Sequence, residues 1–210
     1  VIKEDKLYGR GSCDMKGFIA CTLAYAPIFS KSNLDRDINF AFTFDEEASC
    51  IGAPILIKEL IKRNIKNGIC IIGEPTNMKI IDAHKGCYNY TTYFEGLAGH
   101  SSAPHKGVSA VEYAAKYVNK LIELREKLKE RTPKESIFDP PHSTLQVGGV
   151  FGGIAHNVIA DKCYVDWETR PVVKEDGIFL NNELDKYANE VLLPEMKKVF
   201  PNSSIKKEII

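Results

Sequence analysis

The sequence predicts an α/β protein in two parts: part of a parallel sheet in residues 1–78, then an α+β unit of order βαββαβ in residues 79–210. Two observations support this division. In the first part, short apolar runs flank a helical pattern, which is typical of parallel strand-helix-strand units. In the second part, alternating strands rich in Tyr and Thr combine with two long amphipathic helices.

In the first part, residues 38–44 and 68–72 are predicted strands, and a helix is predicted between them over residues 52–64. Both strand runs are too short and too rich in aromatic or β-branched residues for a helix. We expect both to be buried, the second on both faces of a parallel sheet. A further helix is predicted over residues 18–29, and Pro27 is expected to end or kink it.

The second part has predicted strands over residues 80–94, 143–150, 162–169 and 204–210, and helices over residues 108–129 and 180–200. A kink is expected at Pro194 in the second of these helices. The order predicts a split βαβ sandwich, in which two helices cover one face of a four-stranded antiparallel sheet. Uncharged, Tyr- and Thr-rich strands at the edge of this sheet are expected to pair with a partner chain.

The composition excludes several functional classes. Lys and Arg together number 28, as do Asp and Glu, so the net charge is zero. This balance argues against binding of nucleic acid or of a membrane surface. No apolar stretch approaches the roughly 20 residues of a membrane helix. The six cysteines form no CxxC pair and are expected to be reduced core residues of a cytoplasmic protein. The start at Val1 suggests a piece of a longer protein.

Acidic residues follow both predicted strands of the first part. Asp45, Glu46 and Glu47 come directly after residues 38–44, and Glu74 follows residues 68–72. Ligands of open α/β sheets gather at the carboxyl ends of strands. Clustered carboxylates also repel one another unless a cation compensates. Taken alone, the acidic triplet fits a solvated turn better than a site.

Six motifs occur in the order found in the co-catalytic di-zinc amidohydrolases, and the chain resembles this family over nearly its whole length. They are residues 9–17 (GRGSCDMKG), 45–47 (DEE), 73–76 (GEPT), 99–104 (GHSSAP), 152–159 (GGIAHNVI) and 168–171 (ETRP). The family includes acetylornithine deacetylase, which the chain resembles most, succinyl-diaminopimelate desuccinylase, aminoacylase and glutamate carboxypeptidase.

The resemblance implies that residues 1–78 are part of a zinc-hydrolase catalytic domain with two Zn²⁺ ions, for which Co²⁺ can substitute. Asp14 matches the carboxylate that bridges the two ions, although read alone it fits a helix cap. Glu47 matches a terminal ligand of one ion, and Glu74 matches a terminal ligand of the other. Glu46 matches the general acid/base, which takes a proton from the attacking water and passes it to the leaving amine.

For residues 79–210 the resemblance implies a ferredoxin-like dimerisation or lid domain. His100 matches a histidine that reaches into the site of the partner subunit, although the residues alone favour an ordinary Gly-His-Ser loop. Asn157 and Arg170 match binders of the substrate carboxylate, and a structural salt bridge is the alternative for Arg170. The other four histidines are expected to be surface or loop residues.

The implied reaction is removal of the acyl group from an N-acyl amino acid by a cytoplasmic homodimer, with N-acetylornithine in arginine biosynthesis as the first substrate. Desuccinylase, aminoacylase and dipeptidase fit the same motifs. A dimerising module without chemistry is the alternative outside the enzymes, and the presence of all four acids argues against it. The family's upstream His-x-Asp motif and downstream His ligand are absent. This piece alone is therefore expected to be inactive and to bind zinc weakly.

Overall fold

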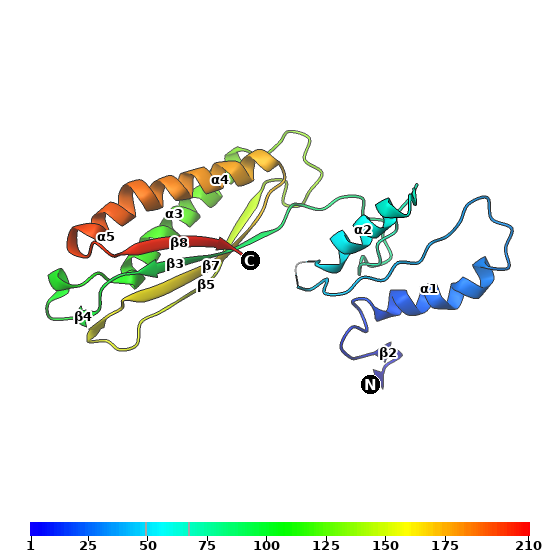
Figure 1. The fold of residues 1–210 in the computed structure, drawn as a ribbon, viewed down its shortest axis with the longest axis horizontal. Helices are drawn as coiled ribbons and strands as arrows, with labels where there is room; N and C mark the ends of the chain where they lie inside the picture. The colour runs from blue at the N-terminus through cyan, green and yellow to red at the C-terminus, as the bar shows by residue number, and fades with distance from the viewer. Residues whose placement is uncertain (49, 67) are drawn as a thin grey trace. The chain divides into compact units, whose positions relative to one another are not determined.

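The structure, a computed structural model, describes residues 1–48, 50–66 and 68–210. The chain divides into two compact units, unit 1 (Val1–Ile81) and unit 2 (Asp82–Ile210) (Figure 1). All buried apolar side chains of the described residues lie in unit 2. Among the same residues, no helix is both long and apolar enough to cross a membrane.

Unit 2 contains an antiparallel sheet whose strands lie in the order β5 (Thr144–Gly152), β7 (Lys162–Arg170), β3 (Tyr88–Glu95) and β8 (Ser204–Ile209). Helix α3 (Ala110–Glu130) connects β3 to β5. Helix α4 (Lys174–Tyr187), the π-helical turn η2 (Ala188–Leu192) and helix α5 (Leu193–Val199) connect β7 to β8. The predicted βαββαβ order is therefore confirmed, and α3 and α4 lie on the same side of the sheet (Figure 1).

Two details of the prediction for unit 2 were wrong. The Tyr- and Thr-rich strand β3 lies inside the sheet, between β7 and β8, so it offers no free edge. The last helical segment begins at Lys174, earlier than predicted, because Glu175 and Asp176 in its first turn favour a helix N-terminus. The kink expected at Pro194 stays a prediction, but the type of helix does change just before this residue. Pro194 lies in the first turn of α5, directly after η2, where a wider turn accommodates the missing N–H and the bulky ring.

The core of unit 2 lies between the sheet and its helices. Alternate side chains of β3 and β7 are buried there, and the ring of Tyr90 stacks on Trp167 with centroids 4.2 Å apart. The indole N–H of Trp167 donates to Oγ1 of Thr92 at 3.0 Å, so this buried donor is satisfied. The helices contribute buried apolar side chains that recur at helical spacing. On α3 these are Ala110, Ala114, Tyr117, Leu121, Leu124 and Leu128, and on α4 and η2 they are Leu180, Leu184 and Leu192.

In unit 1, strands β1 (Ile2–Lys3) and β2 (Lys6–Leu7) form a small hairpin, followed by helices α1 (Lys16–Phe29) and α2 (Gly52–Lys62). The predicted strands at 38–44 and 68–72 are not formed, and their large apolar side chains are exposed. A strand needs hydrogen-bonded neighbours and a covering layer. The described residues of unit 1 provide neither, which explains why the prediction of buried strands failed.

Helix α1 continues past Pro27 and ends at Phe29, the predicted end, so Pro27 does not end the helix, and the alternative of a kink stays a prediction. A further expectation, that the cysteines are core residues, was wrong. Of the six free cysteines only Cys163 is buried, whereas the other five are exposed. Four of these five lie in unit 1, where no core covers their apolar neighbours.

Candidate functional site

The acidic residues at 45–47 lie in a tight corner directly before helix α2. Asp45 has a left-handed backbone (φ 50°), and the N–H groups of Cys50, Ile51 and Gly52 donate to the carbonyls of Glu46, Asp45 and Phe44. A Cβ on Gly52 would lie 2.5 Å from the carbonyl oxygen of Phe44, so only glycine allows the helix to begin this close to the corner.

Electrostatics link this corner to Asp14 and Glu74, two acids of unit 1 that are distant from it in sequence. The pKa of Glu74 is raised, first by burial and then by the negative charges of Asp14, Glu46 and Glu47. The pKa of Cys50 is also raised, first by its hydrogen bond to Glu46, and Glu46 and Glu74 add to the rise. The charges of Asp14, Glu46 and Glu47 therefore reach Glu74, although the two strands that were expected to end at these acids are not formed.

This neighbourhood does not fit a zinc centre by itself. Among the described residues, no group of three or more His, Cys, Asp or Glu side chains is arranged to hold a metal ion. The four acids offer only oxygen ligands, and all five histidines of the chain lie at position 84 or later, in unit 2. Zinc sites combine oxygen with nitrogen or sulfur ligands, so the four acids alone would leave a zinc ion incompletely coordinated.

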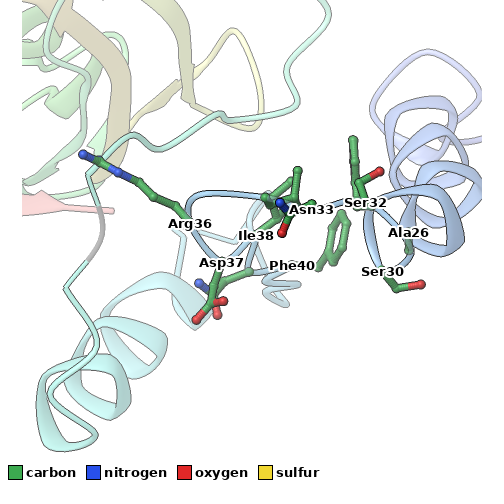
Figure 2. Close-up of a pocket in the computed structure, with 11 residues that line it drawn as sticks. Ala26, Ser30, Ser32, Asn33, Arg36, Asp37, Ile38 and Phe40 are labelled. Atoms are coloured by element: carbon green, nitrogen blue, oxygen red, sulfur yellow. The ribbon is translucent and has the colours of Figure 1, made fainter.

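A hollow of about 540 Å³ in unit 1 is separate from these acids. It lies between the end of α1 and the segment that follows, and Figure 2 shows Ala26, Arg36, Asp37 and Phe40 among the residues around it. None of the predicted site residues lines it.

In unit 2, the structure brings His100 and Asn157 together. Strand β4 (Gly99–His100) pairs with β6 (Val158–Ile159), so His100 lies opposite Val158. The N–H of Ser101 donates to the carbonyl of Asn157 at 3.0 Å. This short ribbon continues the β3–β7 ladder, because the N–H of Gly96 donates to the carbonyl of Asp161 at 2.7 Å.

Arg170 lies at the opposite end of β7 from this ribbon. At about 3.3 Å per residue, Lys162 and Arg170 are separated by about 26 Å along the strand. The guanidinium of Arg170 donates to the carboxylate of Glu168 through Nε at 3.0 Å and Nη2 at 3.2 Å, which raises the pKa of Arg170. Arg170 is exposed and Glu168 is partly exposed, so this pair contributes little to stability and leaves Arg170 accessible.

Sequence reasoning missed two residues, one beside His100 and one at the acidic corner before α2. Ser102 forms hydrogen bonds to the ring of His100, and the Gly-His-Ser-Ser run was the available signal. Gly52 was assigned only to a helix, although its position directly after an acidic corner is typical of a close backbone approach.

Comparison with known families was decisive for unit 2. The family model described as the peptidase dimerisation domain matches residues 82–196, more than half of the chain. The chain belongs to the peptidase dimerisation domain family. The matched range covers His100, Asn157 and Arg170, and it contains nearly all of the βαββαβ unit except β8.

Solved structures that resemble the chain include aminopeptidase PepT from Bacillus cereus, with 21% identity over 62% of this chain and a TM-score of 0.44. An amidase of the hydantoinase/carbamoylase family from Burkholderia multivorans has 14% identity over 60% of the chain and a TM-score of 0.48. The match covers 32% of the first structure and 28% of the second. The chain thus spans about a third of the length of these proteins.

Proposed function

We propose that the chain is part of a dimeric, metal-dependent amide hydrolase, in which the dimerisation domain pairs two subunits and presents His100 and Asn157 to the partner's site. The observation that carries this proposal is the dimerisation-domain fold with both residues on one hydrogen-bonded ribbon. The shared neighbourhood of the four acids in unit 1 supports the hydrolase chemistry.

A second apolar stripe on helix α3 supports the dimer. Val111, Ala115, Val118 and Ile122 recur at helical spacing, and each is at least partly exposed. The opposite flank of α3 faces α4 and α5, where Lys116 pairs with Glu195 at 2.6 Å. Among the described residues of unit 2, the stripe therefore lies on the flank of α3 that faces away from α4 and α5, and a two-fold copy of α3 would cover it.

The two edge strands differ in charge, which favours β5 as the second element of the interface. Residues 144–152 contain no charged residue, whereas β8 carries Lys206, Lys207 and Glu208. Charged side chains protect a strand edge from pairing, so β8 is the blocked edge. Helix α3 packs against β5, and we propose that β5 and the α3 stripe form one continuous isologous interface.

The separation of the two ends of β7 supports a division of roles. Because Arg170 lies about 26 Å along the strand from the ribbon, it is too far away to share one small substrate with His100 of the same subunit. In a dimer, His100 and Asn157 would serve the site of the partner, and Arg170 would bind a substrate carboxylate in another site. Its planar, bidentate geometry suits that carboxylate.

For the chemistry, we propose that Glu46 carries the proton from water to the leaving amine, and that Asp14, Glu47 and Glu74 are carboxylates of a metal centre of two zinc ions. Unit 1 contains no histidine, so histidine nitrogen ligands would come from outside it. The proposed substrate is an N-acyl amino acid, N-acetylornithine first and N-succinyl-diaminopimelate or a dipeptide next.

The test of this proposal uses a complete protein that contains this chain. Steady-state assays with N-acetylornithine, N-succinyl-diaminopimelate and a dipeptide identify the substrate, and Glu46→Gln is then compared with the parent. Loss of a proton carrier should lower kcat about 100- to 10,000-fold with metal content unchanged. Hydrolysis that persists in Glu46→Gln, or activity lost together with bound metal, would contradict the role of Glu46.

The second candidate function is a dimerising module without chemistry. It is favoured by the absence of a grouped metal site among the described residues and by the confinement of the core to unit 2. Calorimetric titration with Zn²⁺ separates the two functions in the complete protein. Tight binding that disappears in Glu74→Gln supports the hydrolase, and dimerisation without any metal binding or amide hydrolysis supports the module.

A further inference from the structure

The ring of His100 is held by the residue two positions later in the chain. The backbone N–H of Ser102 donates to Nδ1 of His100 at 3.2 Å, and Oγ of Ser102 lies 2.8 Å from the same nitrogen. An amide N–H can only donate, so Nδ1 must offer its lone pair. A neutral imidazole carries one proton, which therefore resides on Nε2. The hydroxyl of Ser102 then also donates to Nδ1.

A second histidine of unit 2 shows the reverse arrangement. Nδ1 of His84 lies 2.7 Å from the carbonyl oxygen of Lys85. A carbonyl can only accept, so Nδ1 of His84 must donate and its neutral ring carries the proton there. The same chain thus contains two histidines whose surroundings select opposite tautomers, and each can be the reference for the other.

The ribbon around His100 keeps this arrangement in place. The N–H of Ala103 donates to the carbonyl of His100 at 3.0 Å, which closes a turn directly after the histidine. The side chain of Ile159 lies under Gly99 and Gly107, where an added Cβ would lie 3.1 Å and 2.6 Å from its Cδ1 atom. His100 is exposed, and across the described part of the chain no residue forms a hydrogen bond with its Nε2.

We propose that Ser102 is a positioning residue that holds His100 in the Nε2–H tautomer, so that His100 offers a neutral hydrogen-bond donor to a substrate oxygen. The ligand class is an amide carbonyl, whose oxygen becomes more negative during attack by water. The substrate part of this inference rests on the proposed function, whereas the tautomer does not. The opposite tautomer would present a lone pair on Nε2 and would repel that oxygen.

The test is two-bond ¹H–¹⁵N correlation spectroscopy of the histidine rings in the 210-residue chain, at a pH where the ring resonances no longer change. His84→Gln and His100→Gln assign the two rings. We expect the ¹⁵N shifts of His100 to show that Nε2 carries the proton and that Nδ1 does not. His84 should show the reverse pattern. In Ser102→Ala the Nδ1 resonance of His100 should move toward that of the exposed His105, and Ser102→Thr should restore it.

Nδ1–H or an even mixture of tautomers at His100 would overturn the inference. His100 resonances that are unchanged in Ser102→Ala, which keeps the backbone N–H donor, would overturn the positioning role of the Ser102 hydroxyl. Unchanged fluorescence of Trp167, which is buried in the core, verifies that unit 2 remains folded in each variant. None of these readouts depends on turnover. If the tautomer is found and His100→Gln leaves the activity of the complete protein unchanged, the proposed role of His100 fails while the positioning by Ser102 stands.

Discussion

Asp176 and Arg131 form a salt bridge in which Oδ1 of the carboxylate accepts from Nε of the guanidinium at 2.7 Å. Asp176 is only 1% exposed, and its Oδ2 accepts from the hydroxyl of Ser143 at 2.5 Å. Ser143 in turn accepts from the N–H of Val172 at 2.8 Å. The network joins the end of α3, the start of β5 and the first turn of α4, which are distant in sequence.

Replacing Asp176 with Asn should therefore destabilise unit 2. The change removes the buried negative charge and leaves Arg131 without its partner, and we expect the unfolding free energy to fall by about 2–4 kcal/mol. Urea unfolding followed by Trp167 fluorescence measures it. Asp185→Asn is the matched control, because Asp185 pairs with Lys207 at the surface. The unfolding free energy of this variant should fall by less than about 1 kcal/mol. Equal losses in both variants would contradict the structural role of the network.

The hydroxyl of Thr92 should be needed inside the core. Thr92→Val keeps the shape of the side chain but removes the acceptor of the Trp167 indole N–H, and an unsatisfied buried donor costs about 1–3 kcal/mol. The same urea experiment measures this loss. Thr144→Val, at a partly buried position on β5 whose hydroxyl forms no hydrogen bond among the described residues, is the control with a smaller expected effect. Stability equal to that of the parent would show that the indole finds another partner.

The elements of unit 2 were predictable because their signals are local and their core is complete. The stripe of α3 repeats at helical spacing, and β7 alternates between buried residues such as Val165 and exposed ones such as Tyr164. Strand order was less predictable, because the interior position of β3 depends on which strands pair. The residues of a single strand do not identify its neighbours in the sheet.

The strands of unit 1 could not be predicted correctly from their own residues. The run from Ile38 to Phe44 has strand composition, but its folding depends on neighbours that the described residues do not provide. Glu46, Glu47 and Glu74 were singled out because they follow predicted strands, and Asp14 because of its motif; since neither strand is formed, the strand-end rule itself stays a prediction. The contact of Ser102 with His100 was missed, because donor and acceptor geometry cannot be read from a sequence.

Glu74 should titrate above its ordinary pKa of 4.5, because burial and three neighbouring acids disfavour its charge. The folded chain then binds this proton more tightly than the unfolded chain. The contribution to stability is present below pH 4.5 and is lost as the pH rises through the raised pKa. In ¹³C titrations of the carboxyl groups, Asp14→Asn should lower the pKa of Glu74 and Glu4→Gln should leave it unchanged. A pKa that stays constant in Asp14→Asn would contradict the shared neighbourhood.

Self-association through the α3 stripe is expected to be sensitive to a single charge. Ile122→Glu places a carboxylate in the proposed apolar interface, and burying an unpaired charge there should weaken dimerisation at least 100-fold. Ile178→Glu is the matched control, because Ile178 is an exposed isoleucine on α4, outside the stripe. Circular dichroism of both variants verifies that the helices remain folded.

Sedimentation velocity of the 210-residue chain, together with a piece containing residues 82–210, tests the pairing of two dimerisation domains most directly. Because unit 1 exposes apolar runs, the shorter piece distinguishes pairing through unit 2 from association through unit 1. We predict a dimer for both proteins and for Ile178→Glu, and a monomer for Ile122→Glu. A monomeric 82–210 piece at high concentration, or a dimer that survives Ile122→Glu unchanged, would contradict the proposed interface.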